Sequence, residues 1–95
     1  MFNRITDLND PIITFIQSLR DLDSEVLVDS EKLINKFVSA NRFKPKDLYI
    51  KESLHANFSH TDLFNKIYVI ADGVFNKTSG YKFSKGVLAT FEKPQ

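Results

Sequence analysis

The chain has 95 residues, a formal net charge of +1 and no cysteine, and 42% of its residues are hydrophobic. This length predicts one domain over residues 1–95, and the lack of cysteine excludes a disulfide scaffold or a thiolate zinc site. No run approaches the roughly 18 consecutive apolar residues that cross a bilayer. The N-terminus also lacks a basic start followed by an apolar run, so we expect a cytoplasmic protein that does not bind membranes.

The charge is unevenly distributed. Residues 1–30 hold two basic and six acidic residues, whereas residues 31–95 hold eleven basic and six acidic residues. Such asymmetry can mark a basic face for an anionic partner. The excess of five over 65 residues is small for a dedicated nucleic-acid binder, which favours the alternative of two solvated faces of mixed charge.

Two helices are predicted in the first half of the chain. The first covers 11–21, where Asn9 or Asp10 can cap the N-terminus and Pro11 fits the first turn. The short run Val26–Val28 follows as a brief strand or a buried connection. The second helix covers 31–41, where Asp29 or Ser30 is the cap and Asn41 is a left-handed stop. Its apolar residues repeat at i, i+1, i+4 and i+5: Leu33, Ile34, Phe37 and Val38.

Two later segments are ambiguous between helix and strand. Residues 46–56 predict a third helix after Pro45, although DLYIKE also suits an edge strand. At the end of the chain, residues 81–91 alternate as a half-buried strand does. Ser84 could equally cap a short helix, and we favour a helix over 84–92, with a strand or β-hairpin as the alternative.

The longest helical pattern lies at Ser59–Asn76, SHTDLFNKIYVIADGVFN. Ser59 and Asp62 fit a capping box, and the apolar positions form one broad face. They are Leu63, Phe64, Ile67, Tyr68, Ile70, Ala71, Val74 and Phe75. Taken together, these elements predict a mainly α fold, a compact bundle of four to five short helices, with a small C-terminal β-hairpin as the alternative ending.

The junction of the third and fourth predicted helices partly fits a helix-turn-helix over 46–76. Ser53 supplies the small residue, Asn57 the turn and Phe58 the apolar plug. Glu52 and Lys66 fall on core positions and are misfits. If this unit binds duplex DNA, residues on the outer face of the central helix would contact base edges: His60, Thr61, Asn65 and Lys66. Basic residues near it would contact phosphates: Arg42, Lys44, Lys46 and Lys51.

Other features weigh against this reading or point elsewhere. Asp62 and Asp72 share the outer face and would repel phosphate, so the same residues also fit a solvated helix surface. Val69 and Gly73 lie one turn apart on that face, which suggests a partner contact such as a homodimer. The alternative is that Val69 is an ordinary exposed apolar residue.

No pattern indicates catalysis, a metal site or a cofactor. His55 and His60 are five residues apart and so lie off a common helical face, and the three glycines make no phosphate loop. We therefore predict a small DNA-binding regulatory protein that is not an enzyme and works as a dimer. The alternative is a protein-interaction module, such as an inhibitor, immunity-type or adaptor protein, that uses the acidic first third of the chain.

Overall fold

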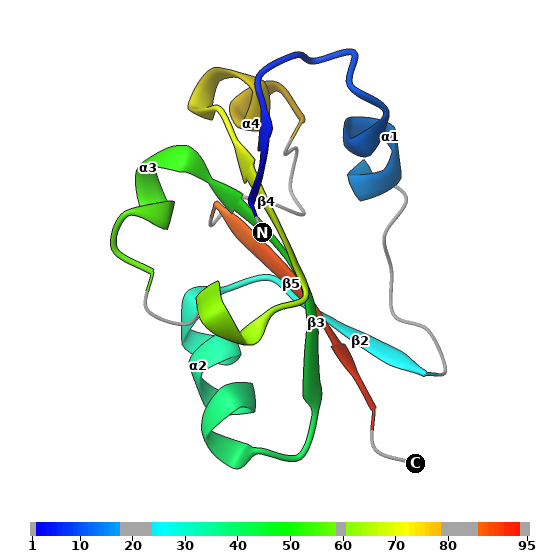
Figure 1. Cartoon of the computed structure of the whole chain (residues 1–95), viewed down its shortest axis with the longest axis vertical. Helices are drawn as coiled ribbons and strands as arrows, with labels where there is room; N and C mark the ends of the chain where they lie inside the picture. Colours follow the sequence, from blue (N-terminus) through cyan, green and yellow to red (C-terminus); the bar gives the residue numbers. More distant parts are fainter. Residues whose placement is uncertain (1, 18–23, 59–60, 79–85, 94–95) are drawn as a thin grey trace.

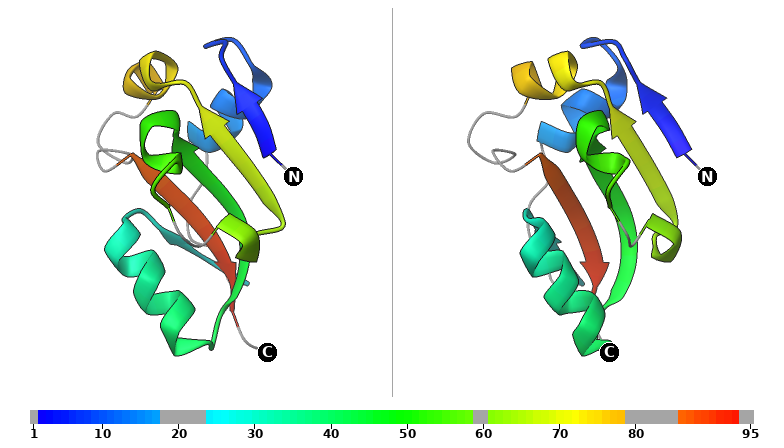
Figure 2. Two further views of the ribbon diagram at one scale, coloured as in Figure 1. Left: turned by 60° about the vertical axis from the view of Figure 1, so that its left-hand side comes forward. Right: turned by 90° about the vertical axis from the view of Figure 1, so that its left-hand side faces the viewer.

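The protein forms a five-stranded mixed sheet with helices on both faces (Figures 1 and 2). The computed structural model describes residues 2–17, 24–58, 61–78 and 86–93. The strands are β1 (Phe2–Ile5), β2 (Glu25–Val28), β3 (Lys44–Lys51), β4 (Lys66–Ile70) and β5 (Val87–Glu92). The helices are α1 (Pro11–Gln17), α2 (Glu31–Ala40), α3 (Glu52–His55) and α4 (Asp72–Thr78), with a 3₁₀ helix η1 (Thr61–Leu63). The predicted mainly α bundle is therefore wrong, and the fold is α/β.

The strand order is β1-β4-β3-β5-β2. Both neighbours of β4 run parallel to it, whereas β5 runs antiparallel to β3 and to β2. The parallel pairs need crossovers, and α3 with η1 provides the one between β3 and β4. Because β3 is central, its residues align with β4 on one side and β5 on the other.

The segment predicted as the central helix is divided between η1, β4 and α4. Its middle, KIYVI, is the strand β4, which packs against an apolar cluster on each face of the sheet. Ile67 and Val69 pack in one core cluster, while Ile70 and Tyr68 pack in the other. A strand covered on both faces reads as a continuous apolar run without alternation. That run matched the i, i+1, i+4 and i+5 positions of a helix by coincidence, which is why the prediction failed.

The two ambiguous segments are also strands. Residues 44–51 form a central strand, and only Glu52–His55 of the predicted third helix is helical. At the end of the chain, Val87–Glu92 forms β5, so the favoured helix over 84–92 is wrong and the strand alternative is correct; residues 84 and 85 lie outside the described ranges. Val87 to Phe91 are all buried, because β5 lies between two strands and between two helical layers.

The first two predicted helices are present. Pro11 begins α1, and residues 18–21 of that prediction lie outside the described ranges. In α2, Ser30 is the N-cap, where its Oγ accepts a hydrogen bond from the Leu33 N–H at 3.2 Å. Asn41 ends the helix with a left-handed φ of 54°. Between the two helices, Val26–Val28 belongs to β2. No helix in the described ranges is long and apolar enough to span a membrane.

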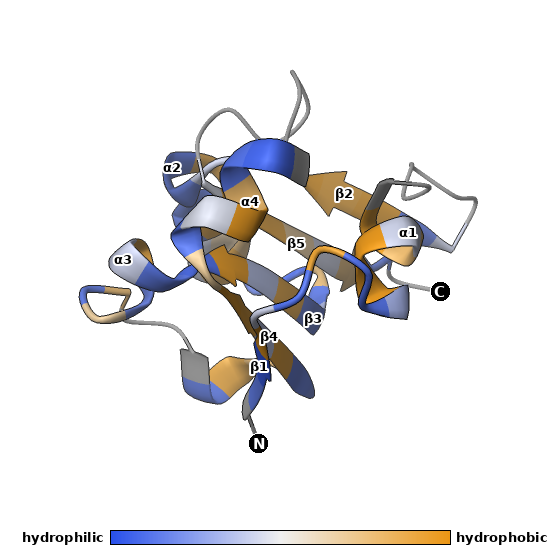
Figure 3. Ribbon diagram, turned by 90° about the horizontal axis from the view of Figure 1, so that it is seen from above, coloured by the Kyte–Doolittle hydropathy of each residue, from blue (hydrophilic) through white to orange (hydrophobic). Residues whose placement is uncertain are grey.

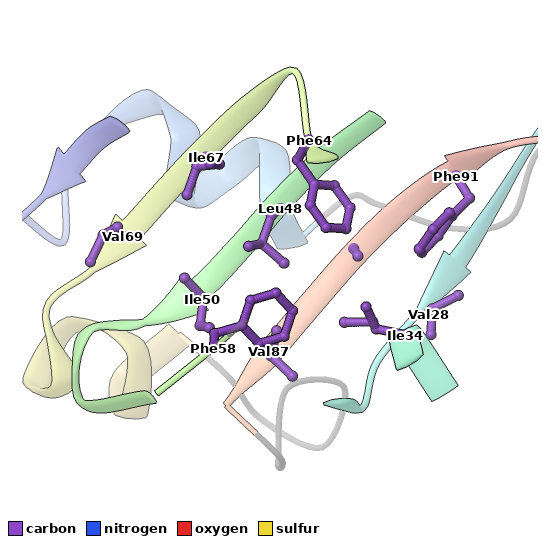
Figure 4. Close-up of a cluster of buried hydrophobic side chains, with 11 residues drawn as sticks. Val28, Ile34, Leu48, Ile50, Phe58, Phe64, Ile67, Val69, Val87 and Phe91 are labelled. Carbon is purple, nitrogen blue, oxygen red and sulfur yellow. The ribbon is translucent and has the colours of Figure 1, made fainter. Parts of the chain in front are cut away.

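One apolar cluster lies on each face of the sheet, and Figure 3 shows hydrophobic residues in the strands between them. On the first face, α2 and the connection between β3 and β4 contribute Ile34, Phe58 and Phe64 (Figure 4). The Phe91 ring lies 5.3 Å from that of Phe37 and 5.6 Å from that of Phe64. On the second face, α1 and α4 cover the sheet with three side chains, Ile13, Ile16 and Phe75. The fold is therefore three-layered, with β3 and β5 buried between the layers.

Two glycines offer a matched test of this packing. Gly86 has a φ of +80°, and a Cβ placed there would lie 2.6 Å from Leu54 Cδ1. Gly73 in α4 has nothing within 4 Å of such a Cβ. We expect Gly86→Ala to lower the free energy of unfolding by about 1–2 kcal/mol, because L-residues are strained at that φ. Gly73→Ala should raise the free energy of unfolding by about 0.4–1 kcal/mol. Urea denaturation of both variants measures the difference, and equal effects would contradict this account.

Candidate functional site

The sheet face that carries α1 and α4 is apolar at one end and polar at the other. Near the carboxyl ends of the parallel strands, Ile5, Ile70 and Leu88 pack beneath the two helices. Toward the amino ends of the parallel strands, other side chains of the five strands lie on the same face, since alternate residues of a strand point the same way. They are largely polar, and we call them the polar surface: Asn3, Glu25, Lys44, Lys46, Asp47, Lys66, Tyr68 and Glu92.

A β-bulge in β3 shapes this surface. Pro45 pairs with Phe91 and Asp47 with Thr90, which leaves Lys46 as the extra residue. In a bulge two residues oppose one on the partner strand and the side chains are redirected. Lys46 thereby reaches across β5 to β2, where its Nζ lies 2.5 Å from Glu25 Oε2. The hydrogen bond from Lys46 to Glu25 raises the pKa of Lys46.

Asp47 lies beside this ion pair and is half-buried. Its N–H donates to Thr90 Oγ1 at 3.2 Å, and its register partner on β4 is Lys66. Burial raises the pKa of the Asp47 carboxyl, and the positive charges of Lys46 and Lys66 oppose that shift only in part. Such a carboxyl accepts a proton more readily than an exposed one. Within the described ranges, no group of three His, Asp or Glu side chains could hold a metal ion.

Two tyrosines form a stack next to these charges. Tyr49 on β3 and Tyr68 on β4 are register partners, and their rings are nearly parallel, at 6°, with centroids 5.2 Å apart. Tyr49 is buried, at 1% exposure, and this burial raises the pKa of its hydroxyl. Tyr68 is only half-buried. The stack therefore runs from the core toward the β1 edge of the sheet.

A separate hollow lies on the opposite face of the sheet. Its volume is about 270 Å³, and it is lined by Ser30, Glu31, Lys32, Ile50, Leu54, Phe58 and Val87. The volume falls slightly below the range of roughly 300–1,000 Å³ that is usual for small-molecule sites. Its floor is apolar and its rim carries one charge of each sign, so it offers no group for acid–base or nucleophilic chemistry beyond Glu31.

Several residues predicted to bind nucleic acid are brought together, although no helix-turn-helix does so. Arg42, Lys44 and Lys46 precede or open β3, while Asn65 and Lys66 lie at the start of β4. The Asn65 N–H donates to the Lys46 carbonyl oxygen at 2.8 Å, which joins the two groups. Lys51 is apart from them, at the other end of β3, where its N–H donates to the Gly86 carbonyl. Thr61 begins η1, and His60 lies outside the described ranges.

The predicted helix-turn-helix is wrong, and Val69 and Gly73 do not share the helical face that was expected of them. In the described part of 46–76, the predicted recognition helix is replaced by η1, β4 and the start of α4. Val69 is buried at 5% exposure inside β4, and Gly73 is exposed on α4. They do not form one surface, because Val69 packs in the cluster on the α2 side of the sheet and α4 covers the other side.

Sequence reasoning missed Asn3, Glu25, Asp47 and Tyr68 as surface residues. Tyr68 was assigned to a helical core, and Asp47 to a helix start. One weak signal was available: Lys66 is a charged residue two positions before Tyr68, and the two side chains share a face if the segment is a strand. Pairing across the five strands then places these residues together, and a single sequence carries no sign of that pairing.

No family model matches the sequence, and neither does any curated protein. Among solved structures, the fold is similar to the crystal structure of an rRNA methyltransferase from Sinorhizobium meliloti, with a TM-score of 0.69 and 16% sequence identity. The match covers 97% of this chain and 37% of that chain. The chain thus spans well under half of the methyltransferase, and the likeness concerns the fold.

The α/β fold also overturns the sequence-based functional prediction, because strands replace the helices of the predicted helix-turn-helix. The neighbour is an α/β protein that is described as an rRNA methyltransferase, not a helix-turn-helix regulator of DNA. Neither the DNA-binding regulator nor the interaction module built on a helical bundle is retained. The expected absence of catalytic activity stays a prediction.

The raised pKa of Asp47 predicts how stability changes with pH. The folded protein takes up a proton at Asp47 at a higher pH than the unfolded chain, whose ordinary value is 3.8. This group therefore disfavours folding at pH 7, and its penalty disappears as the pH falls through the raised pKa. We expect Asp47→Asn to be more stable than wild type at pH 7, with the difference shrinking toward pH 4.

Urea denaturation at several pH values measures this difference. Asp62→Asn removes an exposed carboxylate from η1 and controls for the loss of one negative charge. A stability difference for Asp47→Asn that stays constant with pH, or that grows on acidification, would contradict the assigned environment.

Proposed function

We propose that this chain is an RNA-binding domain of the kind that forms one part of a ribosomal RNA methyltransferase, where it holds RNA for a separate catalytic part. One observation carries the proposal. Nearly the whole chain, 97%, superimposes on only 37% of an rRNA methyltransferase. A domain that corresponds to a minor part of such an enzyme is expected to perform one of the enzyme's functions, such as substrate binding.

The charges of the polar surface and its margin support RNA binding. Arg42, Lys44 and Lys66 are exposed at the amino ends of β3 and β4, and Lys93 is exposed just after β5. Since β5 is antiparallel to β3, the carboxyl end of β5 lies beside the amino end of β3. Exposed lysine and arginine side chains in one region contact phosphates and release counterions. This arrangement suits a polyanion.

Binding is favoured over catalysis because the residues that the structure describes offer little for methyl transfer. A methyl donor needs an enclosed site, and the hollow between α2 and α3 is small and mostly apolar. Asp47, the described carboxyl with a raised pKa, lies on the other face of the sheet. A base and a cofactor pocket on opposite faces cannot act on one substrate atom, so recognition is the task that this geometry suits.

Charge removal tests the proposal. We expect Lys44→Gln/Lys66→Gln to weaken binding of a ribosomal RNA fragment about tenfold at low salt. The slope of log affinity against log salt should fall by roughly 1.4, at about 0.7 for each lost phosphate contact to a single strand. Fluorescence anisotropy with labelled RNA at several salt concentrations provides the measurement.

A double variant on α2 is the matched control. Lys32→Gln/Lys36→Gln removes the same charge from exposed positions on the other face of the sheet, and we expect a much smaller loss of affinity. Equal losses for the two variants would show that net charge alone drives binding. No binding of wild type at low salt would overturn the proposal, as would tighter binding of duplex DNA than of RNA.

A further inference from the structure

The stack of Tyr49 and Tyr68 offers an aromatic surface, which contacts to phosphates do not use. We propose that an unpaired base of the bound RNA stacks on the outward ring face of Tyr68, over Asn3 and beside Lys66. This inference rests on the proposed function. The ligand is thus a single-stranded stretch of RNA, and the site lies on the β1–β4 part of the sheet.

Tyr68 is only half-buried, and the stack accounts for one of its two ring faces. Tyr49 covers the inward face, with the two rings at 6° and 5.2 Å. On the other side, the register partner of Tyr68 is Asn3 of the edge strand β1. Adjacent strands are about 4.8 Å apart, and the short Asn3 side chain cannot cover a phenol ring. A planar base above Asn3 would continue the stack as its third member.

The neighbouring side chains suit a nucleotide. Asn3 is exposed, and its amide both donates and accepts hydrogen bonds, as base edges do. Lys66 is exposed on the same face two residues before Tyr68, a distance of about 6.6 Å along the strand. A base stacked on Tyr68 would therefore have a cation within reach of its own or an adjacent phosphate.

The acidic residues of the polar surface lie away from β1 and β4, which favours the proposed site on these two strands. Its carboxylates lie on β3, β5 and β2, as Asp47, Glu92 and Glu25. The two strands that carry the proposed site, β1 and β4, contain no acidic residue. The Arg4 side chain alternates to the other face, where its Nη2 lies 2.5 Å from Glu52 Oε2 of α3. An RNA strand that crosses β4 and β1 would therefore lie near Lys66 and away from Glu25 and Glu92.

An unpaired strand fits this site better than a duplex. Aromatic side chains on a sheet recognise bases that are unstacked from their neighbours, whereas double-stranded RNA is read through its backbone and shallow groove. A single aromatic ring that extends from a sheet reaches a base only when the base is free. Stacking of this kind tolerates different bases, because each has an aromatic face.

Substitution of Tyr68 separates stacking from charge. We expect Tyr68→Leu to weaken binding of a single-stranded oligoribonucleotide by about 5- to 100-fold and to leave binding of duplex RNA unchanged. Tyr68→Phe keeps the ring and should retain at least half of the affinity. A 2-aminopurine in the oligonucleotide should lose fluorescence on binding wild type and Tyr68→Phe, but not on binding Tyr68→Leu.

Circular dichroism and urea denaturation establish that each variant is folded, since Tyr68 also contacts Tyr49. If Tyr68→Leu does not fold, Asn3→Asp provides the test, because it places a negative charge on exposed β1 beneath the base. Asn3→Asp should then weaken single-strand binding at least fivefold.

The outcomes keep the two proposals apart. Full affinity of folded Tyr68→Leu, or equal losses on single-stranded and duplex RNA, would overturn the stacking site while the RNA-binding function stands. Binding of a free mononucleotide as tightly as of the oligonucleotide would also overturn it, since the site would then serve a small ligand. Absence of binding to either RNA by wild type would remove the proposed function itself.

Discussion

Burial of β3 on both faces is the constraint on which the rest of the structure depends. Leu48, Tyr49 and Ile50 are at most 1% exposed, with β4 and β5 on either side and helical layers above and below. Leu48 and Ile50 pack toward α2 and the Phe58–Phe64 connection, whereas Tyr49 packs toward α1. A chain of 95 residues has little apolar area to spare, and this arrangement uses both sides of one strand. It also fixes the register of β4 and β5, because a slip by one residue would exchange the two faces.

The same strand creates the polar surface at its other end. The bulge at Lys46 interrupts regular pairing with β5, and charged residues replace the apolar ones beyond it. Lys46 is tied to Glu25, which leaves Lys44 and Lys66 as cations for which no carboxylate lies within salt-bridge distance among the described residues. Tyr49 connects the two regions, since it is part of the core and also supports Tyr68. Tyr68 is thus held in place by a buried ring, which lowers the entropic cost of stacking a ligand on Tyr68.

The functional proposal combines two independent observations. The fold corresponds to 37% of an rRNA methyltransferase, and the polar surface presents cations beside a half-exposed aromatic ring. The likeness carries the proposal and the surface adds to its support, because folds serve many functions and solvated surfaces often carry lysines. Together they support the proposal of a domain that would hold an RNA strand by its phosphates and by one base. The hollow near α2 lies on the opposite face, so its occupation would not compete with that strand.

The local features of the chain could be predicted from the sequence. The caps at Ser30 and Asn41 and the proline at the start of α1 act through neighbouring residues, so α1 and α2 were predictable. The assignment of KIYVI and VLATFE as strands required the three-dimensional structure, because a strand that packs on both faces lacks the alternation that distinguishes it from a buried helix. The candidate site also required the three-dimensional structure. The pairing of β1 with β4 and of β4 with β3 brings Asn3, Tyr68 and Tyr49 together, and such long-range pairing depends on the packing of the whole domain rather than on any single segment.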